Sequence, residues 1–264
     1  MLDIISVGHT NIDLFVRSNH VISTEPIQKF GGSASNFAIN CSRLGLNVGF
    51  AGVVGDDEFG RMILRNFRNE RVKFLGTISR KQTGFVIVFS KGSYKRFIKY
   101  LGANNLLKDL AVKEEARHYH FATPPIEILS RMEGSVSLDP GASLSRYSFS
   151  KLKPYLKKVS VFLPNREEAE KITGKNYRES AEMFLKAGVK VVVIKLGKKG
   201  CYAVSGEEKV RMKSKPAKVV DTTGAGDAFD SAFIAAWLKG NSLEECCRQG
   251  IDYSAKCVSR LGAT

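Results

Sequence analysis

The chain has 264 residues, of which 43% are hydrophobic and 25% are charged, and this suits one large globular domain or a domain with a small appendage. No apolar run approaches the ~20 residues that span a bilayer, and the start of the chain has no basic segment followed by an apolar one, so we expect neither a membrane partner nor a signal peptide. The formal net charge of +15 at pH 7 makes nucleic acid or an anionic small molecule the partners to consider.

Strand-like apolar runs and helical patterns alternate along most of the chain. The first strand is expected at 2–8, and a helix follows at 35–45. The later segments are strands at 47–55, 117–124, 135–141, 159–165 and 190–197, and helices at 58–70, 226–240 and 243–260. This alternation predicts an α/β fold, with a mostly parallel central sheet flanked by helices on both faces.

Two stretches interrupt the alternation, at residues 12–30 and 83–100. Both look extended and lack helical patterns, and KGSYK at 91–95 is typical of a hairpin turn. We interpret them as a small antiparallel sheet that forms a lid within a single domain spanning 1–264. A homodimer through this lid is a further expectation.

The cysteine and histidine patterns do not predict a metal centre. The five cysteines show no zinc-ligand spacing and are odd in number, which indicates reduced thiols and a cytoplasmic protein. The four histidines show no ligand spacing either, and His118 and His120 alternate on a strand as core or edge residues do.

The stretch DTTGAGDAF, at 221–229, places a glycine turn at the start of a helix. The first N–H groups of a helix lack partners inside it and carry partial positive charge. Gly224, Ala225 and Gly226 could therefore form an anion hole. Asp227 beside them could take a proton from a hydroxyl, and an anion hole with a base is what phosphoryl transfer to an alcohol requires. The alternative is a plain glycine turn in which Asp227 only offsets the helix dipole.

The chain contains no Walker GxxxxGK[ST] motif and no HRD or DFG kinase set. DTTGAGDAF instead resembles the C-terminal signature of the ribokinase-like (PfkB-type) sugar and nucleoside kinases. Other motifs of that family follow in the same order over nearly the whole chain. They are VGHTNIDLF at 7–15, GGSASNFAINCSRLG at 31–45, TGFVIVF at 83–89 with LGANNLL at 101–107, PNREEAE at 164–170 and IKLGKKG at 194–200. The resemblance implies a ribokinase-like fold with Asp227 as the general base.

The resemblance also implies an acceptor site near the N-terminus. Asn11 and Asp13 would hold hydroxyl groups at the edge where open α/β sheets bind ligands. Gly31 and Gly32 would let the acceptor lie against the backbone, and Asn36 would hydrogen-bond to its hydroxyls. The alternative for Asp13 is a carboxylate that only caps a turn. The alternative for the two glycines is a hinge of the lid and a cap of the following helix.

A nucleotide site in the second half of the chain is implied in the same way. Asn165 and Glu168 share one helix face and would organise Mg²⁺ near the phosphates, through water. The alternative for this pair is a capping box. Lys195, Gly197 and Gly200 would contact the nucleotide. The family commonly has threonine at the position of Lys195, so a side-chain contact with the nucleotide is not expected to be conserved there. The backbone contact from Gly197 does not depend on the identity of any side chain.

Asp221 and Thr223 resemble ligands of the monovalent-cation site that many family members place beside the anion hole. Family members usually continue past the segment that matches the end of this chain and supply further carbonyls there. Because this chain stops at Thr264, we expect a K⁺ site here to be incomplete.

The sequence therefore predicts a kinase that transfers a phosphoryl group from ATP or ADP to a hydroxyl of a sugar or nucleoside. The alternative acceptor is an already phosphorylated sugar, such as a ribose phosphate. Arg96 or Lys99 on the lid would then grip its phosphate, with Lys95 on the face opposite Arg96. The other interpretation of these three cations is protection of an exposed edge strand.

A basic nucleic-acid-binding protein on the same scaffold is the alternative from a different functional class. The basic residues, however, are dispersed among apolar ones and form no stripe with interleaved aromatic residues. We therefore expect an ordinary solvated surface and no nucleic-acid partner.

Overall fold

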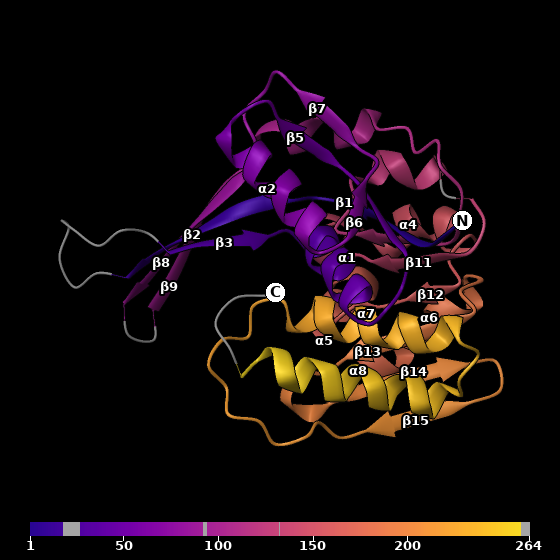
Figure 1. Ribbon diagram of the computed structural model, residues 1–264. Coiled ribbons are helices and arrows are strands. Elements are labelled where there is room, and N and C mark those ends of the chain that lie inside the picture. The colour runs from indigo at the N-terminus through magenta and orange to yellow at the C-terminus, as the bar shows by residue number, and fades with distance from the viewer. Residues whose placement is uncertain (18–26, 92–93, 132, 260–264) are drawn as a thin grey trace.

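The computed structural model describes residues 1–17, 27–91, 94–131 and 133–259, and within them a nine-stranded sheet forms the centre of the protein (Figure 1). Its order is β15-β14-β13-β12-β11-β10-β1-β4-β6. The strands are β1 (Leu2–Gly8), β4 (Val48–Ala51), β6 (Val72–Phe74), β10 (Ala116–Ala122), β11 (Val136–Asp139), β12 (Val161–Phe162), β13 (Val191–Lys195), β14 (Cys201–Ser205) and β15 (Lys209–Met212). Pairing is parallel from β6 to β13 and antiparallel for β14 and β15, which confirms the predicted mostly parallel sheet.

Two details of this sheet were not predicted. The hairpin of β14 and β15 was missed, because its second strand alternates only between exposed and half-exposed residues. The single strand expected at 47–55 divides at Gly52 into β4 and β5 (Val53–Gly55), and β5 pairs with β7 (Thr77–Ser79) in a separate two-stranded sheet. A Cβ on Gly52 would lie 2.6 Å from the Gly8 carbonyl oxygen, so the chain needs glycine where it leaves the central sheet.

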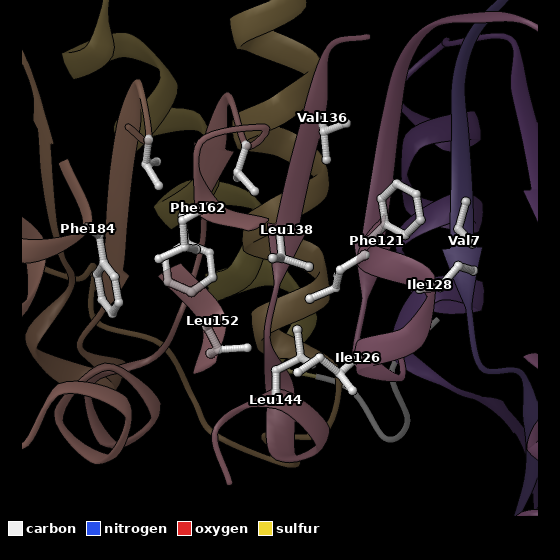
Figure 2. Packing of buried hydrophobic residues seen from close by; sticks show 14 of the residues in the cluster. Val7, Phe121, Ile126, Ile128, Val136, Leu138, Leu144, Leu152, Phe162 and Phe184 are labelled. Atoms are coloured by element: carbon white, nitrogen blue, oxygen red, sulfur yellow. The ribbon is translucent and has the colours of Figure 1, made fainter. Parts of the chain in front are cut away.

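Helices cover both faces of the sheet, and most residues of its inner strands are buried on both sides. On one face, residues of α1, α2, α7 and α8 share a core that includes Phe37, Phe67 and Phe233. On the other, residues of α4, α5 and α6 share a core with Phe121, Leu138 and Phe162. Figure 2 shows part of this core, with Leu152 of α4 and Phe184 of α6. The helices are α1 (Ser33–Arg43), α2 (Glu58–Asn69), α3 (Gly141–Leu144), α4 (Phe149–Leu156), α5 (Arg166–Thr173), α6 (Tyr177–Lys186), α7 (Ala225–Leu238) and α8 (Leu243–Cys257), with 3₁₀ turns η1 (Gly102–Asp109), η2 (Ile126–Arg131) and η3 (Gly197–Lys199).

A second sheet projects from the body of the protein (Figure 1) and confirms the predicted β-sheet lid. Its order is β3-β2-β8-β9, with β2 (Asn11–Arg17), β3 (Ile27–Gly31), β8 (Phe85–Lys91) and β9 (Tyr94–Tyr100). The sheet is mixed rather than antiparallel, since β2 and β8 both run outward from the body and pair in parallel. β8 and β9 are antiparallel, as a hairpin requires. Residues 92–93 of its turn and residues 18–26 of the predicted lid lie outside the described residues.

Three further observations concern the predictions made from composition. No helix in the described part of the chain combines the length and the apolar character that crossing a membrane requires. All five cysteines are free and buried. His118 and His120 are buried in β10, where both rings hydrogen-bond to the hydroxyl of Ser137, so they are core residues as predicted.

Candidate active site

Two cavities lie at the carboxyl edge of the central sheet, where open α/β sheets bind ligands. One, of ≈ 530 Å³, is lined by residues of the lid, of α1 and of the first turn of α7. The other, of ≈ 660 Å³, is lined by residues of η3, of α8 and of the segment before α7. Lys195, Gly197 and Gly226 line both cavities, so the two meet at the end of β13 and the start of α7. We call them the acceptor cavity and the nucleotide cavity, after the ligands that the sequence predicts for them.

The start of α7 has the geometry that an anion hole requires. Gly224 is the N-cap with φ 75°, a left-handed conformation that favours glycine. The Ala225 amide reaches the Thr222 carbonyl oxygen at 3.3 Å, but the amides of Gly226 and Asp227 donate to no carbonyl in the part of the chain that the structure describes. These amides, rather than that of Ala225, are free to meet an anion.

Asp227 lies in the acceptor cavity beside those amides. The Asn36 side chain donates a hydrogen bond of 2.8 Å to its carboxylate across 191 residues of sequence. Burial raises the pKa of Asp227 to about 7; the hydrogen bond from Asn36 opposes this shift, while the charge of Asp139 adds to it. A carboxylate with a pKa near neutrality suits a general base.

The predicted acceptor residues come together in the same cavity. Asp13 lies on β2 of the lid, not in a loop after β1, and its carboxylate accepts a 2.5 Å hydrogen bond from the Asn11 side chain. Burial raises the pKa of Asp13 to about 6, against the opposing effects of Asn11 and the charge of Lys99. A Cβ on Gly31 would lie 2.5 Å from the Asp13 carboxylate, so this glycine is needed for close packing.

Gly32 and Asn36 complete this group. Gly32 has φ 96°, and a Cβ there would lie 2.4 Å from the His9 carbonyl oxygen. It is also the N-cap of α1, as the helix-cap alternative proposed. Asn36 is buried, and its side-chain oxygen has no hydrogen-bond partner among the described residues. Such an oxygen is costly to bury unless a ligand donates to it, and an acceptor hydroxyl would do so.

Asn165 and Glu168 form the capping box of α5. The Asn165 side chain accepts from the Glu168 amide at 2.9 Å, and the Glu168 carboxylate accepts from the Asn165 amide at 2.8 Å. The structural alternative for this pair is therefore correct. Both residues also line the acceptor cavity, so the cap does not exclude a role toward phosphates. Burial, with the nearby charge of Asp139, raises the pKa of Glu168 to about 7.

Lys195, Gly197 and Gly200 lie at the end of β13, as predicted, but their roles differ. Gly200 has φ 88° and packs so closely on β15 that a Cβ would lie 2.0 Å from the Met212 carbonyl oxygen. Gly197 has φ 56° and open space around its Cα. The Lys195 side chain forms ion pairs with Asp139 and Asp230, at 3.1 and 2.7 Å.

Asp139 and Asp230 are functional candidates that the sequence analysis missed. Asp230 lies on α7, a helix composed mostly of apolar residues, and is 1% exposed. A carboxylate in such a helix needs a buried partner, and this signal could have identified it. Asp139 ends β11 and caps the turn that follows, by accepting from the Gly141 amide at 2.9 Å.

Asp221 and Thr223 lie next to each other before α7. The Asp221 carboxylate accepts from the Thr223 hydroxyl at 2.8 Å and from its amide at 3.1 Å. These bonds fix the segment that leads into the glycine turn, which places Gly224 and the first turn of α7 at the junction of the cavities.

The comparisons with known proteins agree with this geometry. A model for pfkB family carbohydrate kinases matches residues 1–264. The chain is 35% identical over 239 residues to an uncharacterized sugar kinase of Archaeoglobus fulgidus, a match that covers 84% of this chain and 95% of that protein. It is 29% identical over 289 residues to an ATP-dependent 6-phosphofructokinase of Thermoanaerobacterium thermosaccharolyticum, with coverage of 99% and 89%. The crystal structure of a ribokinase from Thermotoga maritima superposes with a TM-score of 0.89 at 27% identity, covering 100% of this chain and 95% of that one.

The match over the full chain, at this level of similarity, confirms the predicted family, the ribokinase-like fold and the enzyme class. The chain belongs to the pfkB family of carbohydrate kinases and is a sugar or nucleoside kinase, a phosphotransferase with an alcohol group as acceptor.

Proposed function

We propose that this kinase transfers the terminal phosphoryl group of ATP to a hydroxyl of a neutral sugar or nucleoside, with Asp227 as the general base. ADP is the alternative donor. The observation that carries the proposal is the position of Asp227. It lines the acceptor cavity and follows Gly226, which lines both cavities, and the amides of these two residues have no carbonyl partner among the described residues. Incubation of the protein with a panel of sugars, nucleosides and sugar phosphates, with ATP or ADP, tests it through detection of the phosphate ester.

Each group at the junction has a part in the proposed reaction. The acceptor hydroxyl gives its proton to the Asp227 carboxylate as its oxygen attacks the terminal phosphorus. Asn36 holds that carboxylate in place. The amides of Gly226 and Asp227 face the negative charge of the moving phosphoryl group, with Gly224 supplying the turn. Asn11, Asp13 and the side-chain oxygen of Asn36 bind the other hydroxyls of the acceptor, and Gly31 and Gly32 keep the backbone close to it.

The residues present fit a hydrated Mg²⁺ ion. Among the residues that the structure describes, no group of three or more acidic, histidine or cysteine side chains is arranged to bind a metal directly. Glu168 uses one carboxylate oxygen in the capping box and keeps the other for water on an ion that Asn165 and Glu168 organise. The ion, when bound with the nucleotide, would neutralise phosphate charge. Asp221 and Thr223 are the proposed side-chain ligands of a monovalent cation.

A carboxylate base must be ionised, so pH dependence tests the assignment. We expect kcat/KM to fall as the pH drops through about 7, the pKa of Asp227. Asn36→Ala removes the hydrogen bond that favours the ionised form, so it should raise the pKa and move this acid limb to higher pH. The pH profile of kcat/KM for both proteins measures this shift. A limb that stays in place would assign it to another carboxyl group, such as Glu168.

The structure separates the lid cations that were candidates for binding a phosphorylated acceptor. Lys99 aligns with Val86 and Asp13 across the lid strands and lines the acceptor cavity. Arg96 aligns with Phe89, and alternation along β9 directs it to the opposite face. The side chain of Lys95 lies outside the described residues. Lys99 is therefore the cation that could meet an acceptor phosphate.

If the acceptor is a sugar phosphate, Lys99→Ala should weaken its use by ~1.5–3 kcal/mol, the range for a hydrogen bond to a charged group. Use of neutral sugars and nucleosides should hardly change. Arg96→Ala is the matched control, because it removes a cation from the same strand on the other face. The difference is measured as kcat/KM of each variant for charged and neutral acceptors. Equal small effects of both variants on both kinds of acceptor would mean that these cations only protect an exposed edge strand from pairing.

The lid also supports a proposed homodimer. Its face opposite the acceptor cavity carries Phe89, Ile98 and Tyr100, which are 40%, 55% and 42% exposed. Apolar side chains gathered on one face are typical of a protein interface.

We further propose a cytoplasmic location, because all five thiols are free and buried, as a reducing compartment allows.

A further inference from the structure

Lys195, the last residue of β13, has a nearly buried side chain with two acidic partners, and ending a strand does not require either feature. Its side chain is 11% exposed, and its ammonium group reaches two carboxylates from different elements, Asp139 at the end of β11 and Asp230 inside α7. Burial alone would lower the pKa of Lys195, but the two carboxylates outweigh it and hold the pKa above its usual value. The group is therefore a permanent cation.

The ammonium group also lies against the anion hole. A Cβ built on Gly226 would be 3.6 Å from the Lys195 Nζ atom, which places Nζ beside the first turn of α7. Of the three donors on an ammonium group, two reach Asp139 and Asp230, and no further acceptor among the described residues is within hydrogen-bond distance. Lys195 lines both cavities, so the remaining donor is available where they meet.

A purely structural ion pair is a poor explanation for this arrangement. The free-energy cost of removing buried charged groups from water can equal or exceed the gain from their attraction. Proteins with apolar residues of similar size in place of a buried ion pair or triad are therefore often equally stable. The Gly141 amide holds Asp139 in place, and helix α7 carries Asp230, so the two carboxylates fix the ammonium group rather than merely neutralise it.

We propose that Lys195 contacts the phosphoryl group as it passes from the nucleotide cavity to the acceptor cavity, and that Asp139 and Asp230 position it for this contact. The proposal rests on the proposed transfer from ATP. In that step the bond from the terminal phosphorus to the bridging oxygen of ATP breaks, and a bond forms from the acceptor oxygen to phosphorus. The hydroxyl proton goes to Asp227, and Lys195 donates a hydrogen bond to a phosphoryl oxygen and keeps its own protons.

The first test compares two variants, the single variant Lys195→Met and the double variant Lys195→Met/Asp230→Asn. The single variant leaves two carboxylates, Asp139 and Asp230, without their cation. The double variant removes one of these charges, so it returns the net charge of the cluster to that of the wild type without restoring the ammonium group. We expect kcat to fall ~10²–10³-fold in both, the loss for one donor at an oxyanion hole, with nearly unchanged ADP affinity by calorimetry. Lys199→Met is the control and should behave as the wild type, because it removes an exposed lysine from the 3₁₀ turn η3 that follows β13.

Recovery of most of the kcat in the double variant would overturn the proposal, since charge balance would then be the only role of Lys195. If neither methionine variant folds, Asp230→Asn alone decides. It leaves the ammonium group with one carboxylate fewer, so a non-hydrolysable ATP analogue should bind more tightly relative to ADP, and an unchanged ratio would overturn the proposal. Activity of the wild type with ATP shows separately whether the proposed function holds.

Discussion

Asp227→Asn is expected to lower kcat by ~10²–10⁴-fold, the contribution of a general base, while the protein stays folded. The amide keeps the shape of the carboxylate and can still contact Asn36, but it cannot take the hydroxyl proton. The raised pKa of Asp227 means that the folded state disfavours its ionised form. Replacing it by a neutral amide should therefore leave the melting temperature equal or higher above pH 7.

Steady-state kinetics at pH 8 and thermal unfolding measure the two parts of this prediction. Asp56→Asn is a matched control, because it makes the same exchange at a carboxylate that is 76% exposed and lines neither cavity. A near-normal kcat in Asp227→Asn would remove Asp227 from the role of base and leave it as a partner of the helix dipole.

Asp13→Ala should raise the KM of the acceptor ~10–100-fold, which corresponds to the ~1.5–3 kcal/mol of a hydrogen bond to a charged group. Nucleotide affinity should stay nearly the same, because Asp13 lies on the lid strand β2 and lines only the acceptor cavity. Separate titrations of acceptor and nucleotide measure the two effects.

Gly31→Ala provides an independent check of Asp13. Its Cβ would lie 2.5 Å from the Asp13 carboxylate, so it should displace that side chain without removing it and raise the acceptor KM in the same way. If Asp13→Ala weakens nucleotide binding in parallel with acceptor binding, Asp13 supports the fold of the lid and does not bind the acceptor.

The sheet and its helices could be predicted from sequence because apolar runs of strand length alternate with helical patterns. The lid could be predicted as an interruption of that alternation. The direction of β2 against β8 could not, since it depends on where both strands leave the body. The hairpin of β14 and β15 was missed because polar residues on β15 weaken the strand pattern.

Glycine turns and the motifs around them predicted Asp227, Asp13 and Asn36 as members of one site, although Asn36 and Asp227 are 191 residues apart. The ion pairs of Lys195 with Asp139 and Asp230 could not be predicted from the sequence, because the three residues lie on three elements that come together only in the folded protein. The hydrogen bond from Asn36, which opposes the rise in the pKa of Asp227 that burial causes, depends on the same kind of long-range contact.

A crystal structure of the protein with an acceptor from the activity panel and a non-hydrolysable ATP analogue tests the central claim most directly. The account predicts the acceptor between the lid and α1, with one hydroxyl oxygen ~2.6–3.2 Å from the Asp227 carboxylate, the reach of a general base. The terminal phosphate should lie beside the amides of Gly226 and Asp227 and near the Lys195 ammonium group. An acceptor hydroxyl held by another residue, with Asp227 facing neither ligand, would contradict the account.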